Sequence, residues 1–168
     1  MTTTPLKPRP TRRAAPGFTL VEILIVVVIL GILASIVVPQ FSVATATSKA
    51  TAAASIVRTV QAKVLENYTT LGDFPATIED DWFVEGTTPR NPLVAPPDDT
   101  VILYDTAATS DMDHPAAKTA GSTGAFWYNP TNGSFRVLVP AQTTQAETLA
   151  LYNDANSVQL GTYAATSN

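Results

Sequence analysis

Apolar residues follow two different patterns along the chain. From residue 18 to residue 38 nearly every position is apolar, whereas from residue 53 to residue 71 apolar positions recur every three or four residues. As a helix, the first run would be about 31 Å long, which matches the hydrocarbon core of a bilayer. The second run predicts an amphipathic helix with one apolar stripe. That stripe consists of Ala53, Ile56, Val57, Val60, Val64, Tyr68 and Leu71.

We therefore predict one helix over residues 18–71, with residues 18–38 crossing a membrane. Gly72 is a helix stop signal, and Pro75 follows shortly after it. Pro39 lies inside the predicted helix, where it removes a backbone donor and clashes with the carbonyl four residues back. We expect a kink or a local break there. For Pro39 and Gly31 the alternative is a tolerated irregularity, because both residue types are relatively common in membrane helices.

The remaining residues, 72–168, predict a small globular α+β domain. Strand composition marks residues 101–105, 124–129 and 134–139, and the last two flank the turn Pro130-Thr131-Asn132-Gly133, which predicts a hairpin. Thr144 and Glu147 form a capping-box pattern before a short helix over residues 145–153. Residues 85–100 are rich in proline, and residues 106–123 are small and polar, so we expect surface loops in both ranges.

The predicted fold class is α+β, with the outer half of the long helix packed on a small antiparallel sheet of three or four strands. In residues 134–139, Phe135, Val137 and Val139 alternate with Arg136 and Leu138, so one face of this strand is expected to pack inward. The apolar stripe at 53–71 is the large apolar surface available to cover that face. The aromatic residues 126–128 are explained by packing within the strand rather than by ligand binding.

Charge is distributed unevenly between the amino terminus and the rest of the chain. Residues 1–17 form a basic leader with four Lys and Arg and no acid, which leaves a side-chain charge of −8 on the rest of a chain whose net charge is −4. We expect the leader to be disordered. Basic residues before an apolar span place the amino terminus in the cytoplasm and the carboxy-terminal domain outside it. The acidic body argues against nucleic-acid binding.

The composition also limits the chemistry that the chain can perform. Cysteine is absent, which excludes disulfides, thiol catalysis and Cys-based zinc sites. The single histidine, His114, precedes a proline in a polar loop, and we expect it to be exposed and without a role. No nucleophile-elbow, phosphate-loop or metal-ligand pattern is present, so we predict that the protein is not an enzyme.

Glu22 is the one charged residue of the apolar run, and the residues around it form a recognisable motif. A carboxylate within a membrane span costs roughly 2.5–3.5 kcal/mol on insertion scales, and such residues are usually functional. The residues Gly17-Phe18-Thr19-Leu20-Val21-Glu22, followed by a long apolar run, resemble the processing site of type IV pilins and of the pseudopilins of type II secretion. The resemblance is close from residue 17 to about residue 41, whereas the rest of the chain shares only the general layout.

The resemblance implies processing and assembly. Prepilin peptidase would cut between Gly17 and Phe18 and methylate the new amino group of Phe18. Glu22 would then pair with the Phe18 amine of a neighbouring subunit in a helical filament, or with the amine of its own chain. Gly31 and Pro39 would soften the helix during assembly. One departure is that Ala14-Ala15-Pro16 separate the basic residues from Gly17, where such leaders often place basic residues directly before the glycine.

Among the branches of this family, the chain most resembles a major pseudopilin of type II secretion, because it has a short body, no cysteine and a Pro-rich loop before a terminal hairpin. The resemblance implies that it would sit in the bacterial inner membrane and assemble with other pseudopilins on an inner-membrane platform. It also implies a calcium-ordered loop, for which Asp105, Asp111 and Asp113 are candidates, since calcium prefers hard oxygen ligands. The alternative for these residues is a solvated acidic loop.

Other functions are also compatible with parts of the sequence. The chain resembles a type IV pilin used in adhesion, motility or DNA uptake almost as well. A monomeric, membrane-anchored periplasmic binding domain would need the span but would have no reason to carry Glu22. A cleaved secretory signal is the third alternative, with an A-x-A pattern at residues 44–46 and paired arginines at Arg12 and Arg13, although the apolar run exceeds the usual 7–15 residues.

Overall fold

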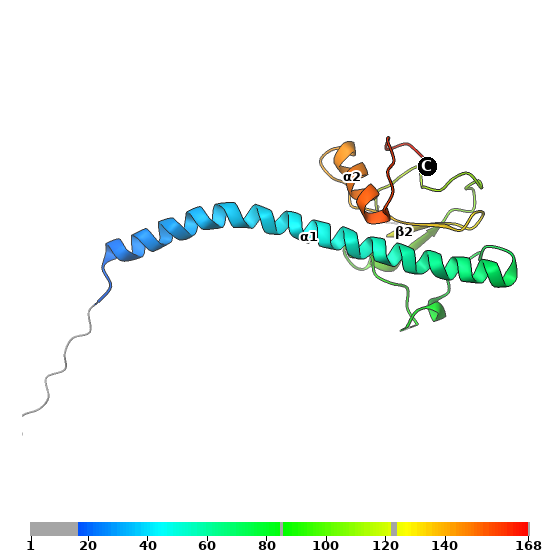
Figure 1. Cartoon of the computed structure of the whole chain (residues 1–168), viewed down its shortest axis with the longest axis horizontal. Coiled ribbons are helices and arrows are strands. Elements are labelled where there is room, and N and C mark those ends of the chain that lie inside the picture. The colour runs from blue at the N-terminus through cyan, green and yellow to red at the C-terminus, as the bar shows by residue number, and fades with distance from the viewer. Residues whose placement is uncertain (1–16, 85, 122–123, 168) are drawn as a thin grey trace, which may run out of the picture. The chain divides into compact units, whose positions relative to one another are not determined.

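The computed structural model describes residues 17–84, 86–121 and 124–167, and of residues 38–43 it describes the backbone alone. Its elements are labelled in Figure 1 and follow in the order α1 (Leu20–Leu71), η1 (Asp80–Trp82), η2 (Asp98–Thr100), β1 (Ile102–Tyr104), β2 (Phe126–Asn129), β3 (Ser134–Val137) and α2 (Gln145–Asn156). The chain divides into two compact units, residues 1–41 and residues 42–168. The predicted leader, apart from Gly17, lies outside the described residues.

The long amino-terminal helix is confirmed. α1 holds 52 residues and is assigned without interruption through Pro39, so the local break predicted there is wrong. Proline removes one backbone donor, and the hydrogen bonds on either side of it keep a helix continuous where the surrounding residues are good helix formers. A kink at Pro39 stays a prediction.

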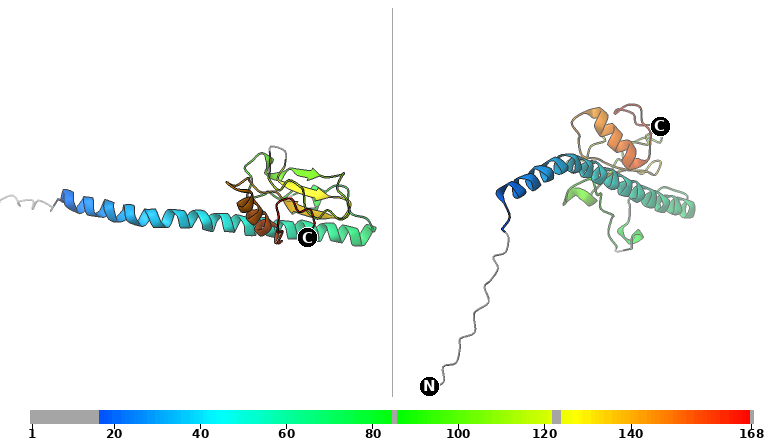
Figure 2. Two further views of the ribbon diagram at one scale, coloured as in Figure 1. Left: turned by 90° about the horizontal axis from the view of Figure 1, so that it is seen from above. Right: turned by 60° about the vertical axis from the view of Figure 1, so that its left-hand side comes forward.

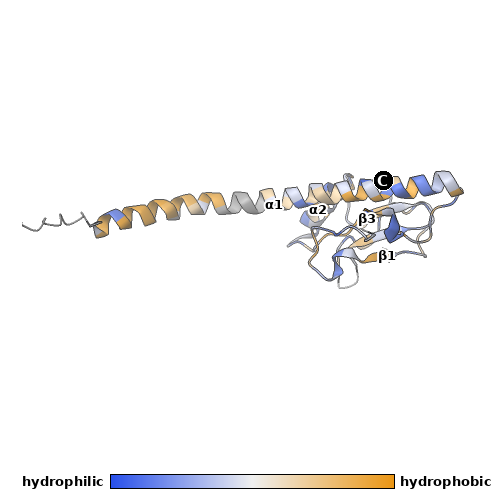
Figure 3. Cartoon of the chain, turned by 90° about the horizontal axis from the view of Figure 1, so that it is seen from below, coloured by the Kyte–Doolittle hydropathy of each residue, from blue (hydrophilic) through white to orange (hydrophobic). Residues whose placement is uncertain are grey.

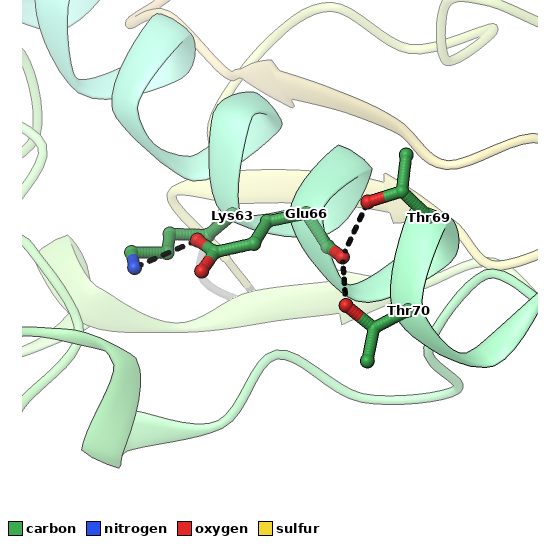
Figure 4. A network of polar contacts seen from close by, with 4 residues as sticks. All are labelled: Lys63, Glu66, Thr69 and Thr70. Atoms are coloured by element: carbon green, nitrogen blue, oxygen red, sulfur yellow. Dashed lines mark hydrogen bonds and ion pairs between the residues drawn. The ribbon is translucent and has the colours of Figure 1, made fainter.

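α1 ends where Gly72 was expected to stop it. Gly72 adopts a left-handed conformation with φ of 84°, and its N–H donates to the carbonyl of Tyr68 at 2.8 Å. This geometry is the usual way in which a glycine closes a helix. Figure 4 shows the last turns, where the hydroxyls of Thr69 and Thr70 donate to the carbonyl of Glu66 at 2.8 and 2.9 Å, and the Glu66 carboxylate pairs with Lys63.

The sheet contains three strands in the order β1-β2-β3 within the described residues. β2 and β3 form the predicted antiparallel hairpin, with Trp127 opposite Arg136. β1 pairs with β2 in the parallel direction, so the wholly antiparallel sheet that we predicted is wrong. Parallel neighbours require a crossover connection, and residues 105–125 supply it here.

The hairpin turn explains why Gly133 is needed. This residue has φ of 73°, and a Cβ atom built on it would lie 2.4 Å from the ring of Phe74 and 3.1 Å from the side chain of Val64. Its N–H donates to the carbonyl of Asn129 at 2.9 Å. The turn therefore packs directly on the end of α1 and on the residues that follow it.

One face of the sheet packs on the part of α1 that lies in the second unit, as Figure 2 shows. The buried side chains of α1 lie at the predicted spacing, and they meet those of the sheet and of α2 in one core. Its central members are Ala53, Val57, Val60, Val64, Phe126, Tyr128, Phe135, Val137, Val139 and Tyr152. The buried stripe ends at Val64, because Tyr68 is 39% and Leu71 70% exposed, contrary to the prediction for these two residues. Tyr68 instead stacks on Phe74, with ring centroids 4.3 Å apart.

The second face of the sheet is also covered, which the alternation of residues 134–139 did not indicate. Trp127 and Leu138 point to this face and form a smaller core with Ala108. Leu103, Met112 and Ala120 pack against it. The segment from Ala108 to Ala120 is therefore a cover for the sheet and not the surface loop that we predicted. It is also the crossover that makes β1 parallel to β2.

This cover carries two buried basic residues. His114, predicted to be exposed, is fully buried, and its Nδ1 lies 3.1 Å from the Tyr152 hydroxyl and accepts a hydrogen bond from Nε of Arg136. Lys118 is also fully buried. Its ammonium donates to the carbonyls of Pro115 and Ala165 at 2.7 and 2.8 Å and lies over the rings of Tyr152 and Tyr163.

The hydrogen bonds of Lys118 and His114 fasten the carboxy-terminal tail to the cover. The carbonyl of Ala165 accepts from Lys118, and the carbonyl of Thr166 accepts from the backbone N–H of His114 at 3.0 Å. The Tyr163 hydroxyl accepts from the backbone N–H of Lys118 at 3.2 Å.

Burial changes the pKa of Lys118. Removal of the ammonium from water, without a paired carboxylate, lowers its pKa to about 8.

Most outward backbone groups of β3 and of Val139, just beyond it, are paired with side chains or with the cover. The Asn156 side chain of α2 accepts from the N–H of Val137 at 2.8 Å and donates to its carbonyl at 3.0 Å, so it replaces a neighbouring strand. The N–H of Val139 donates to the carbonyl of Lys118 at 3.1 Å, and its carbonyl accepts from the N–H of Ala120 at 2.7 Å. The carbonyl of Phe135 accepts from Nη1 of Arg136.

The capping box of α2 at Thr144 and Glu147 is present as predicted. α2 extends to Asn156, three residues beyond the predicted end, and this places the Asn156 amide at the edge of β3.

Replacement of Asn156 tests the importance of this edge. We expect Asn156→Leu to lower the free energy of unfolding by about 3 kcal/mol, because it leaves both buried backbone groups of Val137 without partners. The measurement is chemical denaturation of the full chain in detergent micelles, followed by near-ultraviolet circular dichroism of the tryptophans. Asp154→Ala, at an exposed position of the same helix, is the control and should change the stability by less than about 0.5 kcal/mol. Equal effects of the two substitutions would contradict the assignment.

The lowered pKa of Lys118 predicts a dependence of stability on pH. Between pH 8 and pH 10.5 the unfolded chain binds a proton at this residue and the folded chain does not, so the contribution of Lys118 to stability rises with pH over this window. We expect the difference in unfolding free energy between the wild type and Lys118→Met to move in favour of the wild type by about 2 kcal/mol from pH 7 to pH 10. Chemical denaturation at both pH values measures it. A constant difference would mean that the ammonium keeps its ordinary pKa.

Candidate functional site

The first turn of α1 is built by the residues around the predicted cleavage point. Thr19 directly precedes the helix, and its hydroxyl accepts a hydrogen bond from the N–H of Glu22 at 3.2 Å. In return, the Glu22 carboxylate accepts from the N–H of Thr19 at 2.7 Å and from its hydroxyl at 2.9 Å. These reciprocal bonds are a capping box, which satisfies donors that a helix start otherwise leaves free.

This geometry gives Glu22 a partner within its own chain. The partner of Glu22 in the structure is Thr19, whereas the family resemblance implies an amine. The signal was present in the sequence, because Thr19-x-x-Glu22 directly before an apolar run is the same pattern that we used for α2. A carboxylate is also favoured at the amino terminus of a helix by the helix dipole. Glu22 is therefore accommodated at the start of the span without a second subunit.

The two residues that would be separated by cleavage lie just before the capping box. Phe18 is 84% exposed, and a side chain built on Gly17 would meet no other atom within 4 Å. Neither residue belongs to the helix, which begins at Leu20. The peptide bond between Gly17 and Phe18 therefore lies outside the helix, between an exposed Phe18 and an uncrowded Gly17, as access by a peptidase requires.

The helix that follows has an apolar surface on every side. Residues Leu20–Val37 are long and apolar enough to cross a membrane, and none of them is buried within the structure. Figure 3 shows hydrophobic colour around this part of α1, with polar colour limited to its first turn. An all-round apolar helix needs a membrane or other helices around it. This finding supports a single membrane span, as the sequence predicted.

Gly31 lies within this span, and a Cβ atom at its position would meet no other atom within 4 Å. The helix is assigned without interruption through Gly31 as it is through Pro39. Softening of the helix by these two residues during assembly stays a prediction.

The three candidate calcium ligands are each held by a different set of protein groups. The Asp105 carboxylate accepts from Nε1 of Trp127 at 3.1 Å, and that of Asp113 accepts from the side chains of Asn132 and Ser134, both at 3.2 Å. Asp111 accepts from the hydroxyl of Thr109, and this bond lowers the pKa of its carboxyl. Among the described residues, no three acidic or histidine side chains are grouped as metal ligands. Calcium binding thus stays a prediction, without a preformed cluster to support it.

Comparison with known proteins bears on the amino-terminal segment. Residues 12–38 match the model of the prokaryotic N-terminal methylation motif. No curated protein and no solved structure matches the chain. The motif and the apolar helix together support a membrane-anchored, type IV pilin-like protein that prepilin peptidase processes. The motif occurs in a structural class of proteins that is generally not enzymatic, and the absence of catalysis stays a prediction for this chain.

Removal of the capping hydroxyl should loosen the first turn of α1. We expect Thr19→Val to cost about 1 kcal/mol locally, which corresponds to roughly fivefold faster exchange of the Glu22 amide hydrogen. The measurement is hydrogen exchange by nuclear magnetic resonance on the unprocessed chain in micelles. Thr19→Ser keeps the hydroxyl and should leave the exchange rate unchanged. If Val and Ser gave the same rate, Thr19 would not cap the helix.

Proposed function

We propose that this protein is a structural subunit of a type IV pilus-like filament, and specifically a pseudopilin of a type II protein secretion system. The observation that carries the proposal is Glu22, the one carboxylate of the apolar span Leu20–Val37, which is exposed on every side and lies within the match to the N-terminal methylation motif. Filament assembly gives both features a use, since the apolar surfaces can pack together and the carboxylate can contact another subunit.

Processing would change the electrostatics of the first turn. Cleavage after Gly17 creates an α-amino group on Phe18, next to the positive end of the helix dipole, where a cation is disfavoured. Methylation keeps the amino group basic. The carboxylate of Glu22 lies in the same turn and offsets this charge, either within one chain or between chains. Contact between chains also sets the axial position of each subunit, because burial of either charge alone costs several kcal/mol.

The apolar surface of residues 20–37 supplies the other part of the assembly. Before assembly this surface would be covered by the acyl chains of the inner membrane, with the amino terminus in the cytoplasm and residues 42–168 in the periplasm. In the filament it would be covered by the same helix of other subunits. Other pseudopilins and an inner-membrane assembly platform are the partners that such a transfer requires.

The choice of branch rests on composition. The chain has no cysteine, and its body is short, which favours a pseudopilin over an adhesive pilin that closes a loop with a disulfide. The alternative is a type IV pilin used in adhesion, motility or DNA uptake.

A second candidate function is favoured by one observation. The capping box satisfies Glu22 within one chain, so a monomeric membrane-anchored domain facing the periplasm would also be stable. The two functions differ in what the carboxylate does after processing. In a filament it is needed by the neighbouring subunit, whereas in an anchor it serves only the start of its own helix.

Mass spectrometry of protein from native membranes, combined with substitution of Glu22, tests the proposal. The mature chain should begin at Phe18 and carry about 14 Da of added mass from one methyl group. We expect Glu22→Gln to be processed in the same way and inserted in the membrane, yet to lose filament formation at least tenfold in crosslinking of neighbouring subunits.

The matched control removes a charge elsewhere on the same helix. Glu66 is exposed and pairs only with Lys63 at the surface, so Glu66→Gln should assemble normally. Undiminished crosslinking of Glu22→Gln would overturn the role given to the carboxylate, whereas absence of crosslinking in the wild type would support the plain anchor. A chain that still begins at Met1 would overturn the processing step, and a chain that begins after Ala46 would indicate a secreted protein.

A further inference from the structure

The two edges of the sheet differ in how far their outward backbone groups are hydrogen-bonded. On the outer edge of β3, the outward backbone groups of Val137 and Val139 are fully paired, by the Asn156 side chain and by the backbone of residues 118 and 120. β1 forms the opposite edge of the sheet. On the side that faces β2, the N–H of Phe126 donates to the carbonyl of Val101, and the N–H of Asp105 donates to the carbonyl of Tyr128.

These bonds define which groups of β1 face away from the sheet. Strand residues alternate, so Val101, Leu103 and Asp105 direct their backbone groups to β2, and the residues between them direct theirs outward. The outward residues are Ile102 and Tyr104. No group of the described residues forms a hydrogen bond with their outward N–H and C=O groups. Most outward backbone groups at the β3 edge are thus paired, whereas those of Ile102 and Tyr104 at the β1 edge, the open edge, are not.

The open edge is held in a fixed conformation. The Tyr104 hydroxyl accepts from the backbone N–H of Ile78 at 3.2 Å, and its ring packs edge-on against that of Tyr128. Val101 and Tyr104 are 40% and 38% exposed, so apolar surface is available beside the free backbone groups. Three residues are too few to promote indefinite aggregation, but they suffice to pair with a short incoming strand.

The charge of the surrounding body indicates what kind of strand fits. Residues 72–168 hold twelve acidic and three basic residues. Two of the basic residues, Lys118 and Arg136, are buried, and the third, Arg90, pairs with Asp99. Basic side chains of the body therefore contribute almost nothing to its surface charge.

Acidic residues are also concentrated near β1. Asp98 lies in η2, four residues before Ile102, and Asp80 and Asp81 lie in η1, shortly after Ile78. A depression of about 720 Å³ near the amino-terminal end of β1 is lined by Thr100, Asp80 and Arg90 among others, and the charge of Arg90 is offset by its pairing with Asp99. A strand that continues along this edge would meet negative charge.

We propose that the open edge of β1 binds an extended, basic segment of another polypeptide as a fourth strand. Backbone hydrogen bonds to Ile102 and Tyr104 supply the pairing, as in other cases of strand addition to a sheet edge, and the acidic surface selects basic side chains. A second copy of this body is a poor occupant, because two acidic surfaces would repel each other. The site is independent of α1 residues 20–37 and of the filament proposal.

Hydrogen exchange tests the edge in the free and the bound protein. In the full chain in micelles, the amides of Ile102 and Tyr104 should exchange at least a hundredfold faster than those of Val137 and Val139. Addition of the synthetic peptide acetyl-Lys-Val-Thr-Val-Lys-Val-amide should slow exchange at Ile102 and Tyr104 at least tenfold and saturably. The matched peptide with Glu in place of both Lys residues should have no effect.

Two variants separate the backbone contribution from the charge contribution. Ile102→Pro removes an outward N–H that the fold does not use, and the extended conformation of Val101 suits a residue before proline. It should abolish peptide binding and keep the near-ultraviolet signal of Trp127. Asp81→Asn, at an exposed position without a partner in the described structure, should weaken binding severalfold at low salt.

Three results would overturn the proposal. The first is slow exchange of Ile102 and Tyr104 in the free protein, which would mean that the edge is already closed. The second is absence of saturable binding by the basic peptide, or equal binding of the acidic peptide. The third is protection that rises with protein concentration alone, which would identify a second copy as the occupant.

Discussion

Packing of one stripe of α1 against the inner face of the sheet is the contact on which the structure of the second unit depends. Ala53, Val57, Val60 and Val64 meet the aromatic and β-branched residues of β2 and β3 in one core. An isolated hairpin is marginally stable at best in water, and packing against a helix is one way in which a small sheet gains independent stability. The same contact places the hairpin turn at Gly133 against Phe74, so that the end of α1 and the end of the hairpin support each other.

The second face of the sheet imposes a further requirement, because the body is small and its sheet would otherwise expose Trp127 and Leu138 to water. The crossover segment meets this requirement with Ala108, Met112 and Ala120, and it also brings His114 and Lys118 inside. Among the described residues, Tyr152 and Arg136 contact His114, and carbonyls of the cover and the tail accept hydrogen bonds from Lys118. A buried polar group without a partner costs about 1–3 kcal/mol, so the tail and the cover stabilise each other.

The amino-terminal span depends on a different balance. Its side chains find no cover within the described structure, and its one carboxylate is satisfied by the N–H and hydroxyl of Thr19. The chain thus combines a helix that requires an apolar environment with a body that carries strong negative charge. This combination is compatible with the proposed filament subunit, and the edge of β1 is the proposed site for a polypeptide partner.

Much of this architecture could be predicted from local patterns. The bounds of α1, the stripe from Ala53 to Val64, the hairpin and the capping box of α2 all follow from the spacing of residues that lie close in sequence. The candidate processing site was likewise identified from consecutive residues, and it lies within residues 12–38, which match the N-terminal methylation motif. Thr19 could have been found in the same way, since the capping-box spacing to Glu22 is local.

Contacts between distant residues decided the remainder. The direction of β1, the burial of His114 and Lys118, and the closure of β3 by Asn156 depend on where the crossover and α2 settle on the sheet. No periodicity of a polar segment indicates that it will cover a sheet face, because small polar residues suit a surface loop and a tight cover equally well. Local patterns in the sequence therefore indicate where the helices and strands form. Which faces and edges are covered depends on the pairing of groups far apart in the chain, which no local pattern reveals.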